Sequence, residues 1–339
     1  MITIRDVASH ANVSVTTVSH VINGTRTVSP DAMDRVQKAV IALDYVPSAL
    51  ARSLKSNRTH TVGMLIPNNS NPYFAEMIRG IEDRCFASGF NVVLCNTDDD
   101  PQKQSVYVRV MAEKQVDGLI VVSSGADPDL IGELRQLRMP QVLVDREIDD
   151  LMADLVEVNH ESGAQIATKH LLDLGHRRIA CIAGPQVVSS ARQRLAGYKK
   201  ALAEAGIAFD STLVREGDFT SDGGYDATLS LLTEEGVDAT AVFAANDLMA
   251  FGAICAAAHR GLRIPDDLSI IGFDDIALAR HTNPPLTTVA QPKHETGHLA
   301  ADLLMQRIAE PGRALQKRLL QPVLRERESC AAPAVKGKK

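Results

Sequence analysis

The feature that most limits how this chain can fold is a series of short apolar runs separated by helical stretches. Seven runs of strand length occur between residues 61 and 275: TVGMLIP, NVVLCN, DGLIVVS, PQVLVD, RIACIAG, AVFAAND and LSIIGFDD. Stretches such as PYFAEMIRGIEDRCFASG and GAQIATKHLLDLGH lie between them. Val/Ile/Leu runs that alternate with helices are typical of parallel sheets covered on both faces. We therefore expect an α/β core.

The number of runs indicates two units in this core. Seven strands are more than one mononucleotide-binding fold needs, and the series restarts near residues 159–163, after the loop at Asp149 and Asp150. We therefore expect two doubly wound parallel-sheet subdomains, with a ligand-binding cleft between them.

Polar and aromatic residues follow several of the runs, where ligands meet the carboxyl ends of parallel strands. Each residue alone has a plainer explanation, because Asx residues cap helices and an Asp-Arg pair is often a surface ion pair. Their gathering at one edge of both sheets favours a binding site. The residues are Asn71, Tyr73, Phe74, Asp145, Arg146, Arg192, Arg194, Asn246, Asp247, Asp274 and Gln291.

Motifs of the common enzyme classes are missing. The sequence has no GxGxxG after a strand, no GxxxxGK[ST], no HExxH and no GxSxG. Asp274 and Asp275 could be paired carboxylates, but neighbouring residues after a strand point in different directions. The five cysteines form no CxxC pair and have no histidine at metal-ligand spacing. We expect no catalysis, no cofactor and no metal.

Composition indicates a globular protein, with 45% hydrophobic and 23% charged residues. No apolar run reaches the roughly 18 residues of a membrane span. The first residues, MITIRDVASH, carry charges where a signal peptide needs its apolar segment. We expect a cytoplasmic protein that does not contact a membrane.

Charge is distributed unevenly along the chain. Residues 1–60 contain seven Lys/Arg and four Asp/Glu, a net charge of +3, whereas the whole chain carries −6. A basic head on an acidic body predicts that only the head meets a polyanion such as DNA. An excess this small is also compatible with chance.

The pattern of residues 3–43 predicts three short helices. IRDVASH places apolar residues at helical spacing after a Thr3 cap, and Ser14 caps a second helix that ends at Asn23-Gly24. Ser29-Pro30 opens a third helix, with Met33, Val36, Val40 and Leu43 as its apolar stripe. Such a unit is either an ordinary helical hairpin with a third helix or a helix-turn-helix domain, whose second helix lies in the major groove.

The segment TIRDVASHANVSVTTVSHVINGTRTVS resembles the DNA-binding head of the lactose/galactose/purine repressor family. The resemblance covers nearly the whole chain and implies a helix-turn-helix domain over residues 1–46. It places Val15, Thr16 and His20 against major-groove bases, and Val15 offers only methyl contact, for instance to thymine. It also implies phosphate or groove-edge contacts by Ser14, Thr17, Asn23, Arg26 and Tyr45.

The next segment, PSALARSLKSNRTHTVGMLIP, resembles the hinge helix of this family and the entry into its core. A helix of about two turns is marginal alone in water, so residues 47–60 should order on DNA or against a second copy. The resemblance implies that Leu54 is wedged into the minor groove at the centre of a palindromic operator. Without the resemblance, the sequence around Leu54 favours a residue that packs in a linker over a minor-groove wedge.

The resemblance further implies a periplasmic-binding-protein-like core over residues 61–329. Subdomain one would take residues 61–160 and 291–321, and subdomain two residues 161–290 and 322–329. The motifs NPYF, VDR, SSARQR, GDF, AND, GFDD and AQPK are similar to ribose-binding periplasmic proteins and ribose-operon repressors. The sugar-contacting positions implied are Tyr73, Phe74, Asp145, Arg146, Arg192, Phe219, Asn246, Asp274 and Gln291, to which Asn71 is added from its place after the first strand.

These expectations combine into a transcriptional repressor controlled by a small sugar, D-ribose or a close derivative. Another sugar or a purine is the alternative effector, although Val188 stands where the family's purine repressors have an arginine. A cytoplasmic sugar-binding protein without a DNA role is a more distant alternative. A two-fold operator requires a homodimer. The tail over residues 330–339 has no apolar heptads, so we expect it to be disordered and not to form a tetramerising helix.

Overall fold

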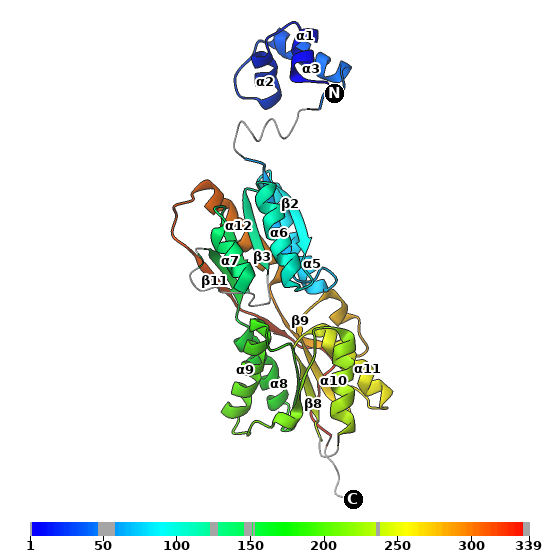
Figure 1. Cartoon of the computed structure of the whole chain (residues 1–339). Coiled ribbons are helices and arrows are strands. Elements are labelled where there is room, and N and C mark those ends of the chain that lie inside the picture. The colour runs from blue at the N-terminus through cyan, green and yellow to red at the C-terminus, as the bar shows by residue number, and fades with distance from the viewer. Residues whose placement is uncertain are drawn as a thin grey trace, which may run out of the picture. The chain divides into compact units, whose positions relative to one another are not determined.

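The structure is a computed structural model that describes residues 2–46, 58–122, 128–145, 151, 153–234 and 238–334. The chain divides into two compact units, a head over Met1–Thr59 and a core over His60–Lys339 (Figure 1). The predicted hinge helix lies almost entirely in residues 47–57, which are outside the described residues.

The head contains three helices, which are α1 (Ile4–His10), α2 (Val15–Asn23) and α3 (Pro30–Ala42). Thr3 and Asp6 form a capping box at the start of α1, and the Ser14 hydroxyl accepts from the Thr17 N–H at the start of α2. Gly24 ends α2 with a φ of 61°, a conformation that glycine adopts without strain. The predicted helix-turn-helix head is therefore confirmed.

The head packs around a small core of Val7, Val18 and Val36. The predicted stripe of α3 is wrong at Met33, whose side chain is 44% exposed. Ala32 and Ala39 are buried with Val36 instead. These three residues recur at i, i+4 and i+7, so they share one face of the helix, and small alanines let α3 approach its neighbours closely.

The core contains two six-stranded sheets. The first has the order β11-β5-β4-β3-β1-β2 and is parallel throughout. The second has the order β12-β10-β9-β8-β6-β7 and is parallel except for β12. The strands are β1 (Thr61–Ile66), β2 (Asn91–Asn96), β3 (Gly118–Val122), β4 (Gln141–Val144), β5 (Asp154–Val158), β6 (Ile179–Ala183), β7 (Val214–Glu216), β8 (Ala241–Ala244), β9 (Ser269–Asp274), β10 (Thr287–Ala290), β11 (Lys317–Leu320) and β12 (Val323–Arg325).

Helices cover both faces of each sheet (Figure 1). Alternate residues of β1 face opposite layers, so Met64 packs with α5 and α12 while Leu65 packs with α6 and α7. On the second sheet, Cys181 packs with α8 and α9, and Ile182 packs with α10 and α11. The helices are α5 (Pro72–Ala87), α6 (Pro101–Glu113), α7 (Pro128–Gln136), α8 (His160–Asp173), α9 (Ser189–Glu204), α10 (Ser221–Thr233), α11 (Asp247–His259) and α12 (Lys293–Ala309).

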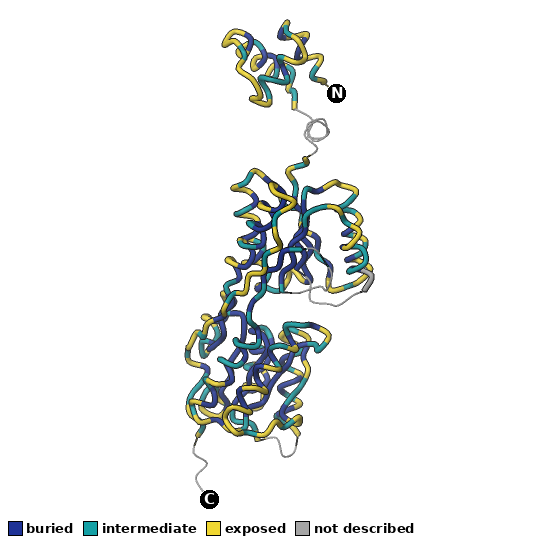
Figure 2. The backbone as a smooth tube through the Cα atoms, turned by 90° about the vertical axis from the view of Figure 1, so that its left-hand side faces the viewer, coloured by how far each residue is buried: buried dark blue, intermediate teal, exposed yellow. Residues whose placement is uncertain are grey.

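Each sheet defines one half of the core, and its buried strands run through the middle of that half (Figure 2). The predicted architecture of two doubly wound subdomains is confirmed. The described chain passes between the halves at three places, after β5, after β10 and after β11. Because the first two of these passages leave the carboxyl ends of strands, they bring residues such as His160 and Gln291 to the edge where a ligand is expected.

The carboxyl-terminal segment is more ordered than the sequence predicts. The backbone of Ala331 bonds to the Ser269 hydroxyl, and the buried His176 ring contacts the Ala331 carbonyl at 2.9 Å. The Ser329 side chain is fully buried beside β9. The expected disordered tail from residue 330 is therefore wrong for its first residues, because these backbone contacts fasten it to the second sheet. Residues 335–339 lie outside the described residues.

Within the described part of the chain, no helix has both the length and the apolar character needed to cross a membrane.

Candidate functional site

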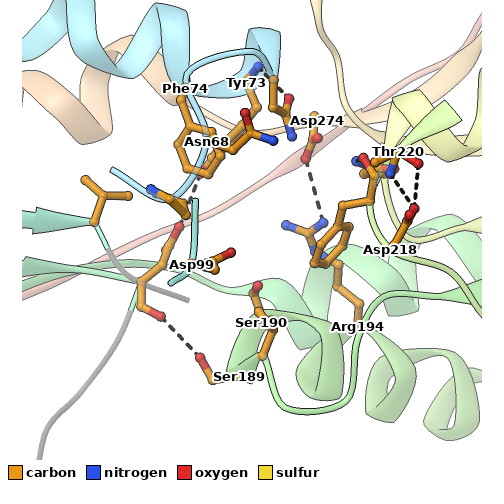
Figure 3. Close-up of a pocket in the computed structure, with 17 residues that line it drawn as sticks. Asn68, Tyr73, Phe74, Asp99, Ser189, Ser190, Arg194, Asp218, Thr220 and Asp274 are labelled. Carbon is orange, nitrogen blue, oxygen red and sulfur yellow. Dashed lines mark hydrogen bonds and ion pairs between the residues drawn. The ribbon is translucent and has the colours of Figure 1, made fainter. Parts of the chain in front are cut away.

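A pocket of about 130 Å³ opens at the carboxyl ends of the strands, where the two halves of the core face each other (Figure 3). Asn68, Tyr73 and Phe74 come from the first half, and Ser190, Arg194 and Asp218 face them from the second half. The complete lining is Pro67, Asn68, Asn71, Tyr73, Phe74, Asp99, Val122, Asp145, Val188, Ser189, Ser190, Arg194, Asp218, Phe219, Thr220, Asn246 and Asp274.

Helix caps place several of these residues at the pocket. Asn71 caps α5, its side-chain oxygen accepting from the Tyr73 N–H, and this cap directs Tyr73 and Phe74 to the site. Asn246 caps α11 in the same way, accepting from the Met249 N–H at 2.9 Å. Each asparagine therefore caps a helix and lines the pocket at the same time.

Phe219 forms an aromatic wall of the pocket, and its backbone has an unusual conformation. Its φ is 66°, in the left-handed region that a bulky residue rarely adopts. The Asn246 side-chain amide donates to the Phe219 carbonyl at 3.0 Å and holds this conformation. Gly184 leaves the space for the ring, since a β-carbon there would lie 2.3 Å from it. Strain of this kind is often retained at binding sites, where the surrounding structure holds it in place.

Arg194 and Asp274 form the charged centre of the pocket. Arg194 is 5% exposed and its guanidinium stacks 4.1 Å from the Phe273 ring centre. Its Nη1 donates to the Ala245 carbonyl at 2.5 Å and lies 3.8 Å from Asp274 Oδ1. Among the described residues no hydrogen-bond partner reaches its Nε. The pair therefore offers fixed donors and an acceptor, the arrangement that binds neighbouring hydroxyl groups.

The pocket sets the protonation of its carboxyl groups in two different ways. Burial raises the pKa of Asp145, but the adjacent His160 ring, the Val158 N–H hydrogen bond and the charge of Arg194 outweigh burial and hold the pKa below its usual value. For Asp274, burial outweighs Arg194 and the Gln291 hydrogen bond, so the pKa lies above its usual value. Burial also raises the pKa of Tyr73 well above its usual value, so its hydroxyl keeps its proton.

The Tyr73 hydroxyl lies between two acceptors from distant parts of the chain. It is 3.2 Å from Asp145 Oδ2 and 3.3 Å from Gln291 Oε1. One hydroxyl has one hydrogen, so it can satisfy only one of them at a time. Gln291 in turn donates to Asp274 Oδ1 at 2.6 Å. Tyr73 therefore bonds either to Asp145 directly or to Gln291, which holds Asp274, but not to both at once.

Substitution of Tyr73 by phenylalanine should weaken effector binding about fivefold to tenfold, because the loss of one hydrogen bond costs about 1 kcal/mol. The ring would remain, so the fold should be unaffected. Calorimetric titration of the variant and the wild type measures the effect. A wild-type affinity in Tyr73→Phe would show that the hydroxyl does not support the site.

Most of the residues predicted to contact an effector are brought together in this pocket. Asn71, Tyr73, Phe74, Asp145, Phe219, Asn246 and Asp274 line it. Gln291 is 4% exposed and lies behind the lining, where it bonds to Asp274. Arg192 does not line the pocket, since its Nη1 donates to the carbonyls of Gln186 and Val187. Arg146 lies outside the described residues.

Arg194 occupies the position for which Arg192 was predicted. The two arginines are two residues apart on α9, so they point to different sides of the helix. A signal for the correct choice exists in the sequence, because Arg194 is spaced i, i+4 and i+7 with the buried Tyr198 and Ala201. Pocket residues that were not predicted from the sequence are Asn68, Asp99, Ser189, Ser190, Asp218 and Thr220. Of these, Asn68, Asp99 and Asp218 follow the carboxyl ends of β1, β2 and β7 within three residues.

The residues predicted to contact DNA lie on and around α2. Val15 is 42% exposed, and Ser14, Thr16, Asn23 and Arg26 are also exposed. Some of them have intramolecular partners: the Thr17 hydroxyl bonds to Ser14, His20 Nδ1 to Thr25 Oγ1 and the Asn23 amide to the Ser19 carbonyl. Tyr45 is half-buried against the head core. Leu54 lies outside the described residues.

Comparison with known protein families agrees with this architecture. Residues 3–48 match the model of the bacterial regulatory proteins of the lacI family, and residues 168–330 match a periplasmic binding protein-like domain. The ribose operon repressor of Escherichia coli K12 is 44% identical over 97% of this chain and 100% of its own length. The chain belongs to the lacI family of DNA-binding transcriptional regulators.

Other relatives in the family differ in what their names say they regulate or bind. The transcriptional repressor PurR of Photobacterium profundum is 44% identical over 91% of this chain and 93% of its own length. A lac repressor dimer bound to operator and the anti-inducer ONPF matches with a TM-score of 0.89 and 31% identity, covering 98% of this chain and 99% of the other. A lacI-family regulator of Enterococcus faecium with bound ribose matches with a TM-score of 0.73 and 33% identity, covering 80% of this chain and 99% of the other.

Proposed function

We propose that this regulator is a repressor whose affinity for a palindromic operator is controlled by a small neutral sugar, D-ribose or a close derivative. The observation that carries the proposal is the pairing of Arg194 with Asp274 inside a pocket walled by Phe74 and Phe219. Aromatic rings cover the apolar face of a sugar, while charged groups bind its hydroxyls. The pocket volume of about 130 Å³ suits one sugar ring better than a drug-sized ligand, since pockets for such ligands measure roughly 300–1,000 Å³.

The charges of the lining support an uncharged effector. The described lining residues include a single cation, Arg194, and four carboxyl groups, which belong to Asp99, Asp145, Asp218 and Asp274. A phosphate group would meet this excess of carboxylates in a partly desolvated pocket, which is unfavourable. Val188 also lines the pocket and offers only methyl groups, so it supplies no partner for the polar edge of a purine.

The assignment to ribose draws on both the pocket and the relatives. The E. coli relative is a ribose operon repressor, and the E. faecium structure contains ribose. PurR of P. profundum is as similar to this chain as the E. coli relative, at 44% identity. We therefore include a purine as a competing effector in the binding test.

For the head, we propose that Val15, Thr16 and His20 read bases in the major groove, with Ser14, Thr17, Asn23, Arg26 and Tyr45 at phosphates or groove edges. The hinge residue Leu54 would enter the minor groove at the centre of the site. A two-fold operator calls for a homodimer, the assembly named for the lac repressor structure bound to its operator.

For regulation, we propose that the sugar shifts the two halves of the core toward the arrangement in which both contact it. A ligand shifts an equilibrium only by its difference in affinity for the two states. A coupling of about 1–3 kcal/mol would change operator affinity roughly 5-fold to 150-fold. The halves proposed are residues 61–160 with 291–321 and residues 161–290 with 322–329.

Calorimetric titration of the full-length protein tests the effector. The ligands are D-ribose, ribose 5-phosphate, other pentoses, hexoses and hypoxanthine. We expect saturable binding of D-ribose and none of ribose 5-phosphate or hypoxanthine. Binding of hypoxanthine or of another sugar in place of ribose would keep the regulator class and discard the ribose assignment.

Selection of binding sequences from a random DNA library tests the operator. The full-length protein should enrich a palindrome, and the sugar found by calorimetry should change its affinity for that sequence. Enrichment of a site without two-fold symmetry would contradict the proposed dimer.

A further inference from the structure

His160 connects two pocket residues from behind the pocket. It is the first residue of α8, directly after the chain leaves β5 and passes to the second half of the core. Its side chain is 2% exposed, and it is neither among the lining residues nor among the predicted site residues. Asn159 caps α8 by accepting from the Ser162 N–H, which fixes where the helix begins and therefore where the His160 ring lies.

The two ring nitrogens of His160 face groups of opposite charge. Arg194 Nη2 lies 3.3 Å from Nδ1, and Asp145 Oδ1 lies 3.3 Å from Nε2. A guanidinium can only donate, so Nδ1 must accept from Arg194. The ring hydrogen is then on Nε2, which is buried 3.3 Å from Asp145 Oδ1 and has no other partner among the described residues, although the contact falls short of hydrogen-bond geometry. The contacts of the ring thus select one tautomer.

These contacts join the two halves of the core. Asp145 follows β4 in the first sheet, whereas Arg194 lies on α9, which covers the second sheet. Both residues line the pocket. Asp145 is held further by the Val158 N–H at 3.0 Å, and Arg194 by the Ala245 carbonyl. His160 is therefore a rigid spacer between an acceptor on one half and a donor on the other.

We propose that His160 is a positioning residue, which sets the spacing of Asp145 and Arg194 and thereby decides which hydroxyl pattern of a sugar the pocket accepts. The inference rests on the proposed function, since it assigns a role within the same effector site. A ring that only filled space would give the fold stability without affecting the choice between related sugars.

Two near-isosteric variants separate the two contacts of the ring. In His160→Asn, the side-chain oxygen can stand near Nδ1 and still accept from Arg194, but the donor to Asp145 is lost. In His160→Gln, the side-chain amide can reach the position of Nε2 and donate to Asp145, but Arg194 loses its acceptor. His176→Gln is the matched control, because His176 is equally buried and contacts Thr240, Ser269 and Ala331 rather than the pocket.

Titration of the full-length protein with D-ribose, 2-deoxy-D-ribose and 5-deoxy-D-ribose gives the decisive ratios of Kd. Each His160 variant should change the ratio of Kd between at least one deoxy sugar and D-ribose about tenfold. The reason is that a displaced Asp145 or Arg194 no longer bonds to the hydroxyl that the deoxy sugar lacks, so D-ribose loses its advantage. The two variants should affect different ratios. His176→Gln should lower thermal stability and leave all ratios at wild-type values.

Wild-type ratios in both His160 variants, or the same change in His176→Gln, would overturn the proposal while leaving the sugar site intact. A wild-type protein that binds none of the three sugars would instead reject the ribose assignment. Nitrogen NMR of the His160 ring in the free protein still tests the inference in that case. We expect a neutral ring with its hydrogen on Nε2, and a hydrogen on Nδ1 would overturn the proposed contacts whatever the effector.

Discussion

Asp274→Asn is expected to lose the effector response while it keeps operator binding. The carboxylate of Asp274 lies inside the pocket opposite Arg194, and it is 3% exposed. An ionised acceptor forms hydrogen bonds worth about 1.5–3 kcal/mol each to its donors. Loss of the charge should therefore weaken sugar binding about 100-fold, and operator affinity should no longer change at sugar concentrations that act on the wild type.

The choice of asparagine avoids a second effect at this position. The φ of Asp274 is 120°, where most side chains are strained, and asparagine tolerates a positive φ better than alanine does. Asp274→Ala is expected to lose the response as well, with an added cost in thermal stability. Fluorescence anisotropy measures operator affinity with and without sugar, and so distinguishes loss of the sugar response from loss of operator binding.

Asp275→Asn supplies the control for Asp274. Asp275 is the next residue, also has a positive φ, and pairs with Arg327 rather than facing the pocket. Its substitution should leave the sugar response unchanged. A normal response in Asp274→Asn would show that the effector binds elsewhere and that the assigned pocket is wrong.

The parts of the fold that the sequence predicts are those with a strong apolar pattern. Runs such as TVGMLIP and LSIIGFDD are buried on both faces because they lie in the middle of a sheet, and their continuous apolar pattern follows from that position. The strands that were missed have weaker patterns. For example, β7 (VRE), β11 (KRLL) and β12 (VLR) lie at sheet edges, where one side meets water and charged residues are favoured.

The pocket was predictable from the sequence where a residue directly follows a strand. Asp145 and Asp274 follow β4 and β9, and Asn71 and Asn246 cap the helices that come after β1 and β8. Their positions follow from the rule that ligands meet the carboxyl ends of parallel strands. Ser189 and Ser190 could not be found in this way, because they reach the pocket from the first turn of α9.

Contacts between distant parts of the chain were even less predictable. Tyr73 and Gln291 are 218 residues apart, and His160 joins residues on two different sheets. No local pattern encodes such contacts, since they depend on how the crossing segments bring the two halves together. They become visible only in the assembled core.

Arg194→Gln is expected to have the largest effect of any single substitution in the pocket. Arg194 is buried between Asp274, His160 and the Phe273 ring, and its fork of donors is held by the Ala245 carbonyl. Removal of one partner from a buried charged pair costs about 3–5 kcal/mol, because the other charge is left without compensation. We expect sugar binding to fall more than 100-fold and thermal stability to fall with it.

Arg192→Gln is the matched control, since it removes an arginine from the same helix two residues away. Its guanidinium contacts the Gln186 and Val187 carbonyls outside the pocket. Sugar binding by Arg192→Gln should therefore equal that of the wild type in calorimetric titration. Arg194→Lys refines the comparison, because lysine keeps the charge but cannot reproduce the planar fork that reaches Asp274, His160 and Ala245 together. If Arg192→Gln lost sugar binding and Arg194→Gln kept it, the choice of Arg192 from the family resemblance would be right and the pocket geometry wrong. The opposite result is expected, because Arg194 rather than Arg192 lies on the buried face of α9.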